Sequence, residues 1–91
     1  MEGYIPCEVA EGFFPQERSV VVTDYSGRRL TFFVDKDAVK VKSEPNGEKV
    51  VNGYVVVSLL KTLRDRALVN VPAEGEDSLI TILYKSIKRY L

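Results

Sequence analysis

Short apolar runs separated by turn signals are the feature that most limits what this 91-residue chain can fold into. Segments of about four to eight residues rich in Val, Ile, Phe and Tyr recur along its length, which is typical of an all-β sandwich or a small barrel. We predict strands at residues 4–10, 18–24, 28–34, 39–42, 54–60, 67–71 and 79–85. The expected fold is a small antiparallel barrel or sandwich of about six or seven short strands, all-β or with one short helical element.

A β-hairpin is the clearest local prediction. Segments 18–24 and 28–34 are apolar and rich in β-branched and aromatic residues, and residues 25–27 (Tyr-Ser-Gly) form a short connection between them. Directly after the second segment, Asp35 is expected to accept a hydrogen bond from a backbone N–H two residues on. It would then open a single helical turn.

Three breaks are predicted between the strands. Residues 11–15 contain a Gly and a Pro, which weaken or interrupt a strand. Residues 44–48 (Glu-Pro-Asn-Gly-Glu) form a strong turn signal, because Pro presets φ and Asn-Gly tolerates positive φ. A further break is predicted at Asn52 and Gly53, so the short stretch before them is expected to be a flexible loop.

Two segments also fit a helix. Segment 58–67 begins with a potential cap, Ser58, and a helix over segment 78–90 could be capped by Asp77 or Ser78. Residues 80–82 (Ile-Thr-Ile) are all β-branched, and such residues lose side-chain freedom in a helix but pack well on a pleated sheet. We therefore expect strands at both places, and the alternative is an α+β fold with a C-terminal helix packed on the sheet.

The chain also resembles itself. Residues 2–5 (Glu-Gly-Tyr-Ile) resemble residues 52–55 (Asn-Gly-Tyr-Val), and residues 33–37 resemble residues 82–86 at nearly the same offset. The alternative is that any β-rich chain aligns loosely with itself. We expect a single domain over residues 1–91, with the repeat predicting two similar halves, residues 1–44 and 52–91.

Several predicted strands are apolar on both faces. Residues 20–22 (Val-Val-Val), 30–34 apart from its Thr, and 55–57 (Val-Val-Val) lack the alternation of a sheet with one solvated face. A C-terminal helix, closure into a barrel or a second chain would each cover the other face. We expect a small barrel that self-associates through one β surface.

Composition excludes several classes of protein. Apolar residues are 45% and charged residues 29% of the chain, as in ordinary globular domains, so intrinsic disorder is disfavoured. Thirteen basic residues balance thirteen acidic ones, so any attraction to nucleic acid or to an anionic membrane must come from a local patch. The N-terminal residues lack a signal-peptide pattern and no run approaches a membrane span, so we expect a cytoplasmic protein without a membrane partner.

Groups that usually carry catalysis are scarce. The chain has no His and a single cysteine, Cys7, which excludes an intramolecular disulfide framework and the usual zinc sites. Cys7 lies in a predicted strand and is expected to be a small buried hydrophobe rather than a nucleophile. Asp35 and Asp37 lie on a predicted turn, where capping explains them. No glycine-rich phosphate loop is present. We expect a non-enzymatic protein without cofactor or metal. The acidic loop residues Glu74, Glu76 and Asp77 are expected to be only solvated, and the alternative is a carboxylate-only hydrolase or a magnesium site on that loop.

Two groups of residues are candidates for binding. Basic and aromatic side chains of the hairpin and the following segment are suited to stack on bases and to neutralise phosphates, but an ordinary solvated turn is the simpler reading. They are Tyr25, Arg28, Arg29, Lys36, Lys40 and Lys42. A second basic group near the C-terminus allows the same two readings, a binding patch or ordinary solvated surface. It comprises Lys85, Lys88 and Arg89 beside Tyr84 and Tyr90. Phe13 and Phe14 are expected to plug one end of the barrel, and the alternative is an exposed anchor for a protein partner.

The strand count and short turns are typical of SH3-like and other small barrels in general, and no motif ties the chain to a named family. We expect a non-enzymatic interaction module that binds a protein partner or self-associates as a homo-oligomer. The alternative is a weak single-stranded nucleic-acid-binding barrel that uses the local basic and aromatic patch.

Overall fold

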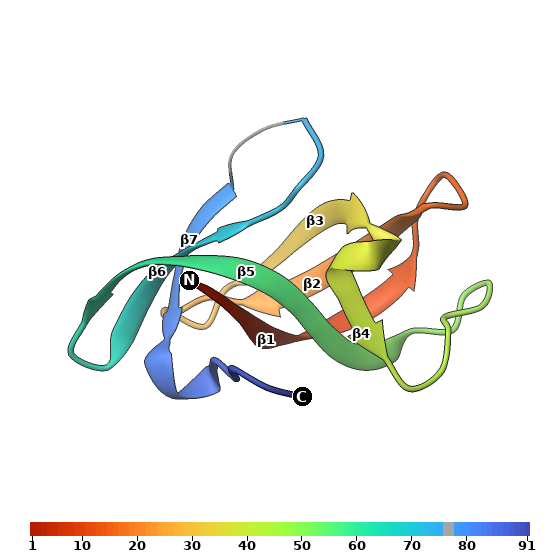
Figure 1. Cartoon of the computed structure of the whole chain (residues 1–91). Helices are drawn as coiled ribbons and strands as arrows, with labels where there is room; N and C mark the ends of the chain where they lie inside the picture. The colour runs from red at the N-terminus through yellow and green to blue at the C-terminus, as the bar shows by residue number, and fades with distance from the viewer. Residues whose placement is uncertain (76–77) are drawn as a thin grey trace.

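The computed structural model describes residues 1–75 and 78–91, and that part of the chain forms strands and two single-turn 3-10 helices (Figure 1). The strands are β1 (Glu2–Glu11), β2 (Glu17–Thr23), β3 (Arg29–Asp35), β4 (Val39–Val41), β5 (Val51–Leu63), β6 (Arg66–Val71) and β7 (Ser78–Leu83). The helices are η1 (Lys36–Ala38) and η2 (Tyr84–Ser86).

The strands form one antiparallel sheet in the order β3-β2-β1-β5-β6-β7, with β4 added beside β5. The two ends of the sheet approach each other. The Glu74 N–H donates to the Phe33 carbonyl oxygen at 2.8 Å, and the Tyr25 N–H donates to the Thr81 carbonyl oxygen at 2.7 Å. The sheet therefore curls into a half-barrel (Figure 1), which confirms the prediction of an all-β fold of the small-barrel kind. The described part of the chain has two single-turn helices where at most one short helical element was predicted.

The core lies inside the curl. Val55 and Val57 are buried while Val56 between them is only half-buried, and residues 20–22 follow the same pattern. These two runs are therefore covered fully on one face only, whereas in the run 30–34 Val34 alone is buried. The buried apolar side chains are those of Ile5, Cys7, Val9, Val20, Val22, Val34, Val39, Val55, Val57, Ala67, Val69, Val71, Ile80 and Ile82.

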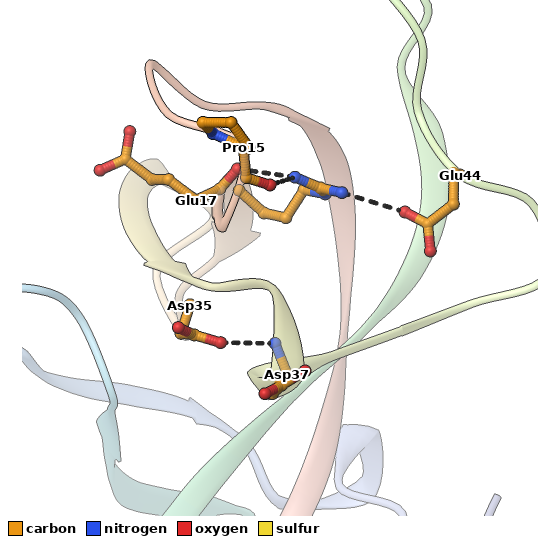
Figure 2. Close-up of polar contacts among 6 residues, drawn as sticks. Pro15, Glu17, Asp35, Asp37 and Glu44 are labelled. Atoms are coloured by element: carbon orange, nitrogen blue, oxygen red, sulfur yellow. Dashed lines mark hydrogen bonds and ion pairs between the residues drawn. The ribbon is translucent and has the colours of Figure 1, made fainter.

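The predicted hairpin and helical turn are confirmed. β2 and β3 pair antiparallel from Glu17 opposite Asp35 to Thr23 opposite Arg29. Asp35 then caps η1, because its carboxylate accepts a hydrogen bond from the Asp37 N–H at 2.8 Å (Figure 2). The reading of Asp35 as a capping residue therefore holds.

The predicted break at Asn52 and Gly53 is wrong, because both residues lie inside β5. The glycine serves a close approach between strands rather than a turn. A Cβ atom at position 53 would lie 2.6 Å from the Lys40 carbonyl oxygen and 2.7 Å from a methyl carbon of Val41. Gly53 thus allows β4 to lie against β5. The turn predicted at residues 44–48 is present, and in it the Lys49 N–H donates to the Asn46 carbonyl oxygen at 3.0 Å. The flexible loop expected between this turn and Asn52 is shorter than predicted, because Val51 already belongs to β5.

Strands form at both places where a helix was the alternative. Residue Ser58 lies within β5, and β7 takes up the β-branched run 80–82, as predicted. The predicted strand 79–85 is two residues too long, because the chain turns into η2 after Leu83. In the described part of the chain no helix is long and apolar enough to cross a membrane.

The two halves of the sheet have corresponding elements. Residues 1–44 supply β1, β2, β3, η1 and β4, and residues 52–91 supply most of β5 together with β6, β7 and η2. β1 and β5 pair at the centre, and each half also reaches across to the other. Lys40 in β4 lies opposite Tyr54 in β5, and Lys88 forms a bridge with Tyr4 in β1. Duplication remains a prediction, but Tyr4 and Tyr54 are the residues that the sequence comparison aligns.

Candidate functional site

The hairpin tip between β2 and β3 is closed by its own hydrogen bonds. The Asp24 carboxylate accepts from the Ser26 N–H at 3.0 Å, from the Ser26 hydroxyl at 2.8 Å and from the Arg28 N–H at 2.9 Å. It also forms an ion pair with the Arg28 guanidinium at 3.4 Å. These bonds, the Ser26 hydroxyl first, lower the pKa of Asp24. Gly27 adopts a φ of 91°, which favours glycine.

Tyr25 is docked against the other half of the sheet. Its hydroxyl donates to the Asp65 carboxylate at 3.0 Å, and the Arg66 guanidinium lies over its ring, 4.1 Å from the centroid. Its N–H bonds to Thr81, as described above. One ring face and the hydroxyl therefore have partners within the chain, and Tyr25 ties β2–β3 to the β5–β6 turn and to β7.

Arg29 is also paired within the sheet. Its guanidinium donates to the Glu8 carboxylate at 2.7 Å, across the outer faces of β3 and β1. The hydrogen bond first, and the charge of Arg29 second, lower the pKa of Glu8, and the same pairing raises the pKa of Arg29. The charges at this end of the hairpin are thus largely balanced by acidic neighbours.

The six residues predicted as one basic and aromatic patch fall into separate places. Tyr25, Arg28 and Arg29 lie at the hairpin tip, whereas Lys36 lies in η1 at the far end of β3. Since a strand rises about 3.3 Å per residue, the seven residues of β3 separate them by roughly 20 Å. Lys40 lies in β4 and Lys42 just beyond it, on the side of the sheet where β5 begins.

Lys40 and Lys42 line a groove that the C-terminal segment completes. The groove has a volume of about 730 Å³, and we call it the basic groove. It runs between β4, the first residues of β5 and the last residues of the chain, and it joins residues from both basic groups singled out in the sequence. Its lining residues are Lys40, Val41, Lys42, Ser43, Val51, Asn52, Gly53, Tyr54, Lys88, Tyr90 and Leu91.

The C-terminal segment is held in place on β1. The Tyr4 N–H donates to the Lys88 carbonyl oxygen at 2.7 Å, and the Lys88 N–H donates to the Tyr4 carbonyl oxygen at 2.8 Å. The Ile87 side chain packs over Gly3, where an added Cβ would lie 2.6 Å from it. These contacts fix the position of Lys88 beside the groove.

The remaining residues of the second basic group lie elsewhere. Tyr84, Lys85 and Arg89 line a separate, smaller pocket of about 180 Å³ beside the N-terminus. The sequence therefore identified Lys88 and Tyr90 as binding candidates but not their association with Lys40 and Lys42. The alignment of Tyr4 with Tyr54 was the one available signal, because each tyrosine marks the position where a lysine from the other half pairs.

Phe13 and Phe14 do not plug the barrel, which corrects the expectation. Their exposed fractions are 80% and 68%. The Phe13 ring packs instead against Phe33 on the outer face of β3, with ring centroids 5.4 Å apart. The inward positions near this end of the sheet are taken by Val20 and Val34, so the core is filled without the two phenylalanines. The alternative reading, an exposed aromatic pair, is the one that the structure shows.

The loop that carries this pair, residues 12–16, is well held. The Glu17 side chain is only 6% exposed, and its carboxylate accepts a hydrogen bond from the Phe13 N–H at 2.7 Å. The Glu17 N–H donates to the Phe14 carbonyl oxygen at 3.0 Å. Arg18 donates to the Pro15 carbonyl oxygen at 3.0 Å and to the Glu44 carboxylate at 3.3 Å (Figure 2). We call residues 12–16 the Phe loop.

A second apolar surface lies on the outer face of β5, β6 and β7. Leu63 and Leu83 lie opposite Arg66 on its two sides, so the three side chains share one face of the sheet. Leu79 lies on the same face as Leu83, four residues away on β7. All three leucines are exposed. We call Leu63, Leu79 and Leu83 the leucine face.

Cys7 is buried in the core, as expected, with an exposed fraction of 7%. Burial first, and the negative charge of Glu8 second, raise the pKa of the Cys7 thiol to about 12. The thiol is therefore protonated at neutral pH, whereas nucleophilic attack requires the thiolate.

The acidic loop is described only in part. Glu74 lies near Glu17 and Asp35, and its pKa is raised, first by a hydrogen bond with the Glu17 carboxyl group. The other acidic residues of this prediction, Glu76 and Asp77, lie outside the described residues. Among residues 1–75 and 78–91 no group of three or more acidic or Cys side chains is placed to hold a metal ion.

Comparisons with protein-family models, with curated proteins and with solved structures found no match to this chain.

Proposed function

We propose that this chain is a non-enzymatic small β-barrel module that binds a protein partner in the cytoplasm. The observation that carries the proposal is the exposure of Phe13 and Phe14 on the hydrogen-bonded Phe loop. Aromatic side chains dominate the energetics of many protein interfaces, and a cluster of them in water marks an interaction site. The proposed contact surface is the Phe loop together with Phe33.

The buried carboxylate of Glu17 prepares this loop for binding. Because its bond to the Phe13 N–H fixes the backbone, little conformational entropy remains to be lost on association. Transfer of a phenylalanine side chain from water into an apolar pocket contributes roughly 1.5–3 kcal/mol. The two rings are therefore expected to be the residues whose truncation weakens partner binding most.

The test is affinity capture of partner proteins from cell lysate with the tagged chain and with matched variants of it. Binding of the purified partner is then measured. The double variant Phe13→Ser/Phe14→Ser removes the aromatic pair, and Leu63→Ser/Leu79→Ser removes two other exposed apolar side chains, from the leucine face. We expect a partner that is captured by wild type and by the leucine variant but not by the phenylalanine variant. With the purified partner, loss of both rings should weaken binding at least about a hundredfold, as for interface hot spots.

Two outcomes would overturn the proposal. One is a partner that binds the phenylalanine variant as tightly as wild type. The other is a folded wild-type protein that captures nothing above the level of the double variant. Circular dichroism of all variants checks that the sheet is retained, which the exposure of these side chains predicts.

A second candidate function is self-association, and the leucine face is the observation that favours it. A second copy placed against the outer face of β5–β7 would bury Leu63, Leu79 and Leu83 in a two-fold contact. Light scattering over a range of concentrations should then show a dimer for wild type and a monomer for Leu79→Lys/Leu83→Lys. A clean 10.3 kDa monomer of wild type at high concentration would contradict it.

A further inference from the structure

We propose that the basic groove binds single-stranded nucleic acid, with its lysines on the phosphates and its tyrosines on the bases. The site is separate from the Phe loop and uses none of its residues. It comprises Lys40, Lys42 and Tyr54 from β4 and β5, and Lys88 and Tyr90 from the C-terminal segment.

The charge of the basic groove is positive. The chain as a whole has equal numbers of basic and acidic residues, so only an uneven distribution attracts a polyanion. Three lysines line the groove, and among the described residues none of them forms an ion pair. The described lining contains no acidic side chain. Glu44, the first acidic residue after Lys42, forms an ion pair with Arg18 at 3.3 Å.

The basic groove also carries aromatic side chains. Tyr54 lies directly opposite Lys40 in the β4–β5 pair, so the two side chains are neighbours on one face. Tyr90 at the other wall is 88% exposed, and its ring has no partner among the ring pairs and cation contacts of the described residues. Cations beside open aromatic faces are the combination with which small β-barrels hold single strands.

The shape of the groove favours a single strand over other polyanions. An acidic peptide would pair with the lysines, but its acidic side chains carry no planar rings to stack on the tyrosine faces, whereas every nucleotide supplies a phosphate and a base. A duplex hides its base faces, and reading one from the major groove usually takes a helix or a two-stranded ribbon, whereas this site is a concave groove of about 730 Å³. Exposed Asn52 on its wall also offers an amide to base edges.

The groove is formed before any ligand arrives. One wall is β4, which is paired with β5 at three positions, and the other wall is anchored by the two hydrogen bonds between Tyr4 and Lys88. A ligand therefore does not need to order either wall.

The test measures fluorescence anisotropy of labelled oligo(dT) and oligo(U) twelve-mers with the full chain at several salt concentrations. We expect binding that weakens as salt rises, with a slope near −2 on a double logarithmic plot, because about 0.7 counterion is released per phosphate contact and three lysines are available. The variant Lys40→Ala/Lys42→Ala/Lys88→Ala should lose most of this slope. The matched control Lys36→Ala/Lys61→Ala/Lys85→Ala, with three lysines from outside the groove, should keep it.

Tyrosine variants separate stacking from charge attraction. Tyr90→Ala should weaken oligonucleotide binding roughly tenfold, the effect of losing one stacked base. Tyr84→Ala, a control at another exposed tyrosine, should leave it unchanged. Poly-glutamate of matched charge should compete poorly.

The proposal would be overturned if the two triple-lysine variants lost oligonucleotide affinity equally, or if Tyr90→Ala bound as tightly as wild type. It would also be overturned if poly-glutamate displaced the labelled strand as well as an unlabelled oligonucleotide does, or if no binding were seen at low salt. Binding of free phosphate or a mononucleotide as tight as that of the twelve-mers would do so too. The Phe13→Ser/Phe14→Ser variant should bind the oligonucleotides normally, so this result is independent of the protein partner.

Discussion

The hairpin tip and the basic groove contain the same kinds of residue but differ in what those residues contact. At the tip, Arg28 and Arg29 are paired with carboxylates and Tyr25 is covered by Arg66. In the groove, the lysines have no acidic partner among the described residues, and the face of Tyr90 is open. Basic and aromatic composition alone therefore does not define a binding site. What matters is whether the chain has already used those groups to close its own fold.

The largest loss of stability is expected from Gly53→Ala, which changes the contact between β4 and β5 in the wall of the basic groove. The added methyl carbon would lie 2.6 Å from the Lys40 backbone oxygen, so β4 must move away from β5. Overpacking of this kind costs about 1–3 kcal/mol, and a urea unfolding curve should show that loss. Oligonucleotide binding should weaken at the same time. An unchanged unfolding midpoint would contradict the close approach of the two strands.

At the hairpin tip, Gly27→Ala should introduce backbone strain without a clash against any described residue. No atom of the described residues lies within 4 Å of the added carbon, yet the φ of 91° is unfavourable for alanine. We expect a loss of about 1 kcal/mol in urea unfolding and no change in oligonucleotide binding. Gly27→Asn, which tolerates positive φ better, should lose less. A binding defect in either variant would show that the tip belongs to the binding surface.

Acid should weaken the hydrogen bonds that close the hairpin tip, and comparison with Asp24→Asn isolates their contribution to stability. The pKa of Asp24 lies below its ordinary value of 3.8, because the ionised carboxylate receives hydrogen bonds from Ser26 and Arg28. A carboxyl group with a lowered folded pKa adds stability that is fully present above its unfolded pKa and is lost as pH falls through its folded pKa. Between about pH 5 and pH 2, wild type should therefore lose stability more steeply than Asp24→Asn.

Urea unfolding at a series of pH values measures this slope. Lys42→Ala changes a residue of the groove and removes no carboxylate, so its unfolding free energy should depend on pH as that of wild type does. Equal slopes for wild type and Asp24→Asn would mean that the hydrogen bonds of Asp24 do not contribute to stability.

The smallest effect on stability is expected from Lys42→Ala. This side chain is exposed and, in the described part of the chain, has no ion-pair partner, so the free energy of unfolding should change by less than about 0.5 kcal/mol. Oligonucleotide affinity should nevertheless fall, and its salt slope should become shallower by about 0.7. A stability loss as large as that of Gly27→Ala would show that Lys42 supports the fold instead.

Most of the fold could be predicted from local patterns. The β-branched run in β7, the short hairpin connection and the capping position of Asp35 each depend on residues a few positions apart, and all three are found. Gly53 was misread because its role depends on Lys40, which only the pairing of β4 with β5 brings near. An Asn-Gly pair usually signals a turn, but here the glycine serves a close contact between strands.

The binding surfaces were less predictable for the same reason. Lys40 and Lys88 meet at one groove only because the C-terminal segment returns to Tyr4 in β1, a contact between opposite ends of the chain. The partners that neutralise Arg29 and cover Tyr25 are also distant in sequence. The exposure of Phe13 and Phe14 depends on whether the core is already full, which no local pattern reveals.

The contacts between the two halves of the chain determine what a cut between them would do. β1 and β5 pair at eight positions, β4 from the first half bonds to β5, and Lys88 from the second half bonds to β1. The peptide link through the turn at Asn46 and Lys49 is therefore not the main tie between the halves. A protease cut in that turn is expected to leave a nicked protein whose two fragments stay together and can be separated only by denaturant.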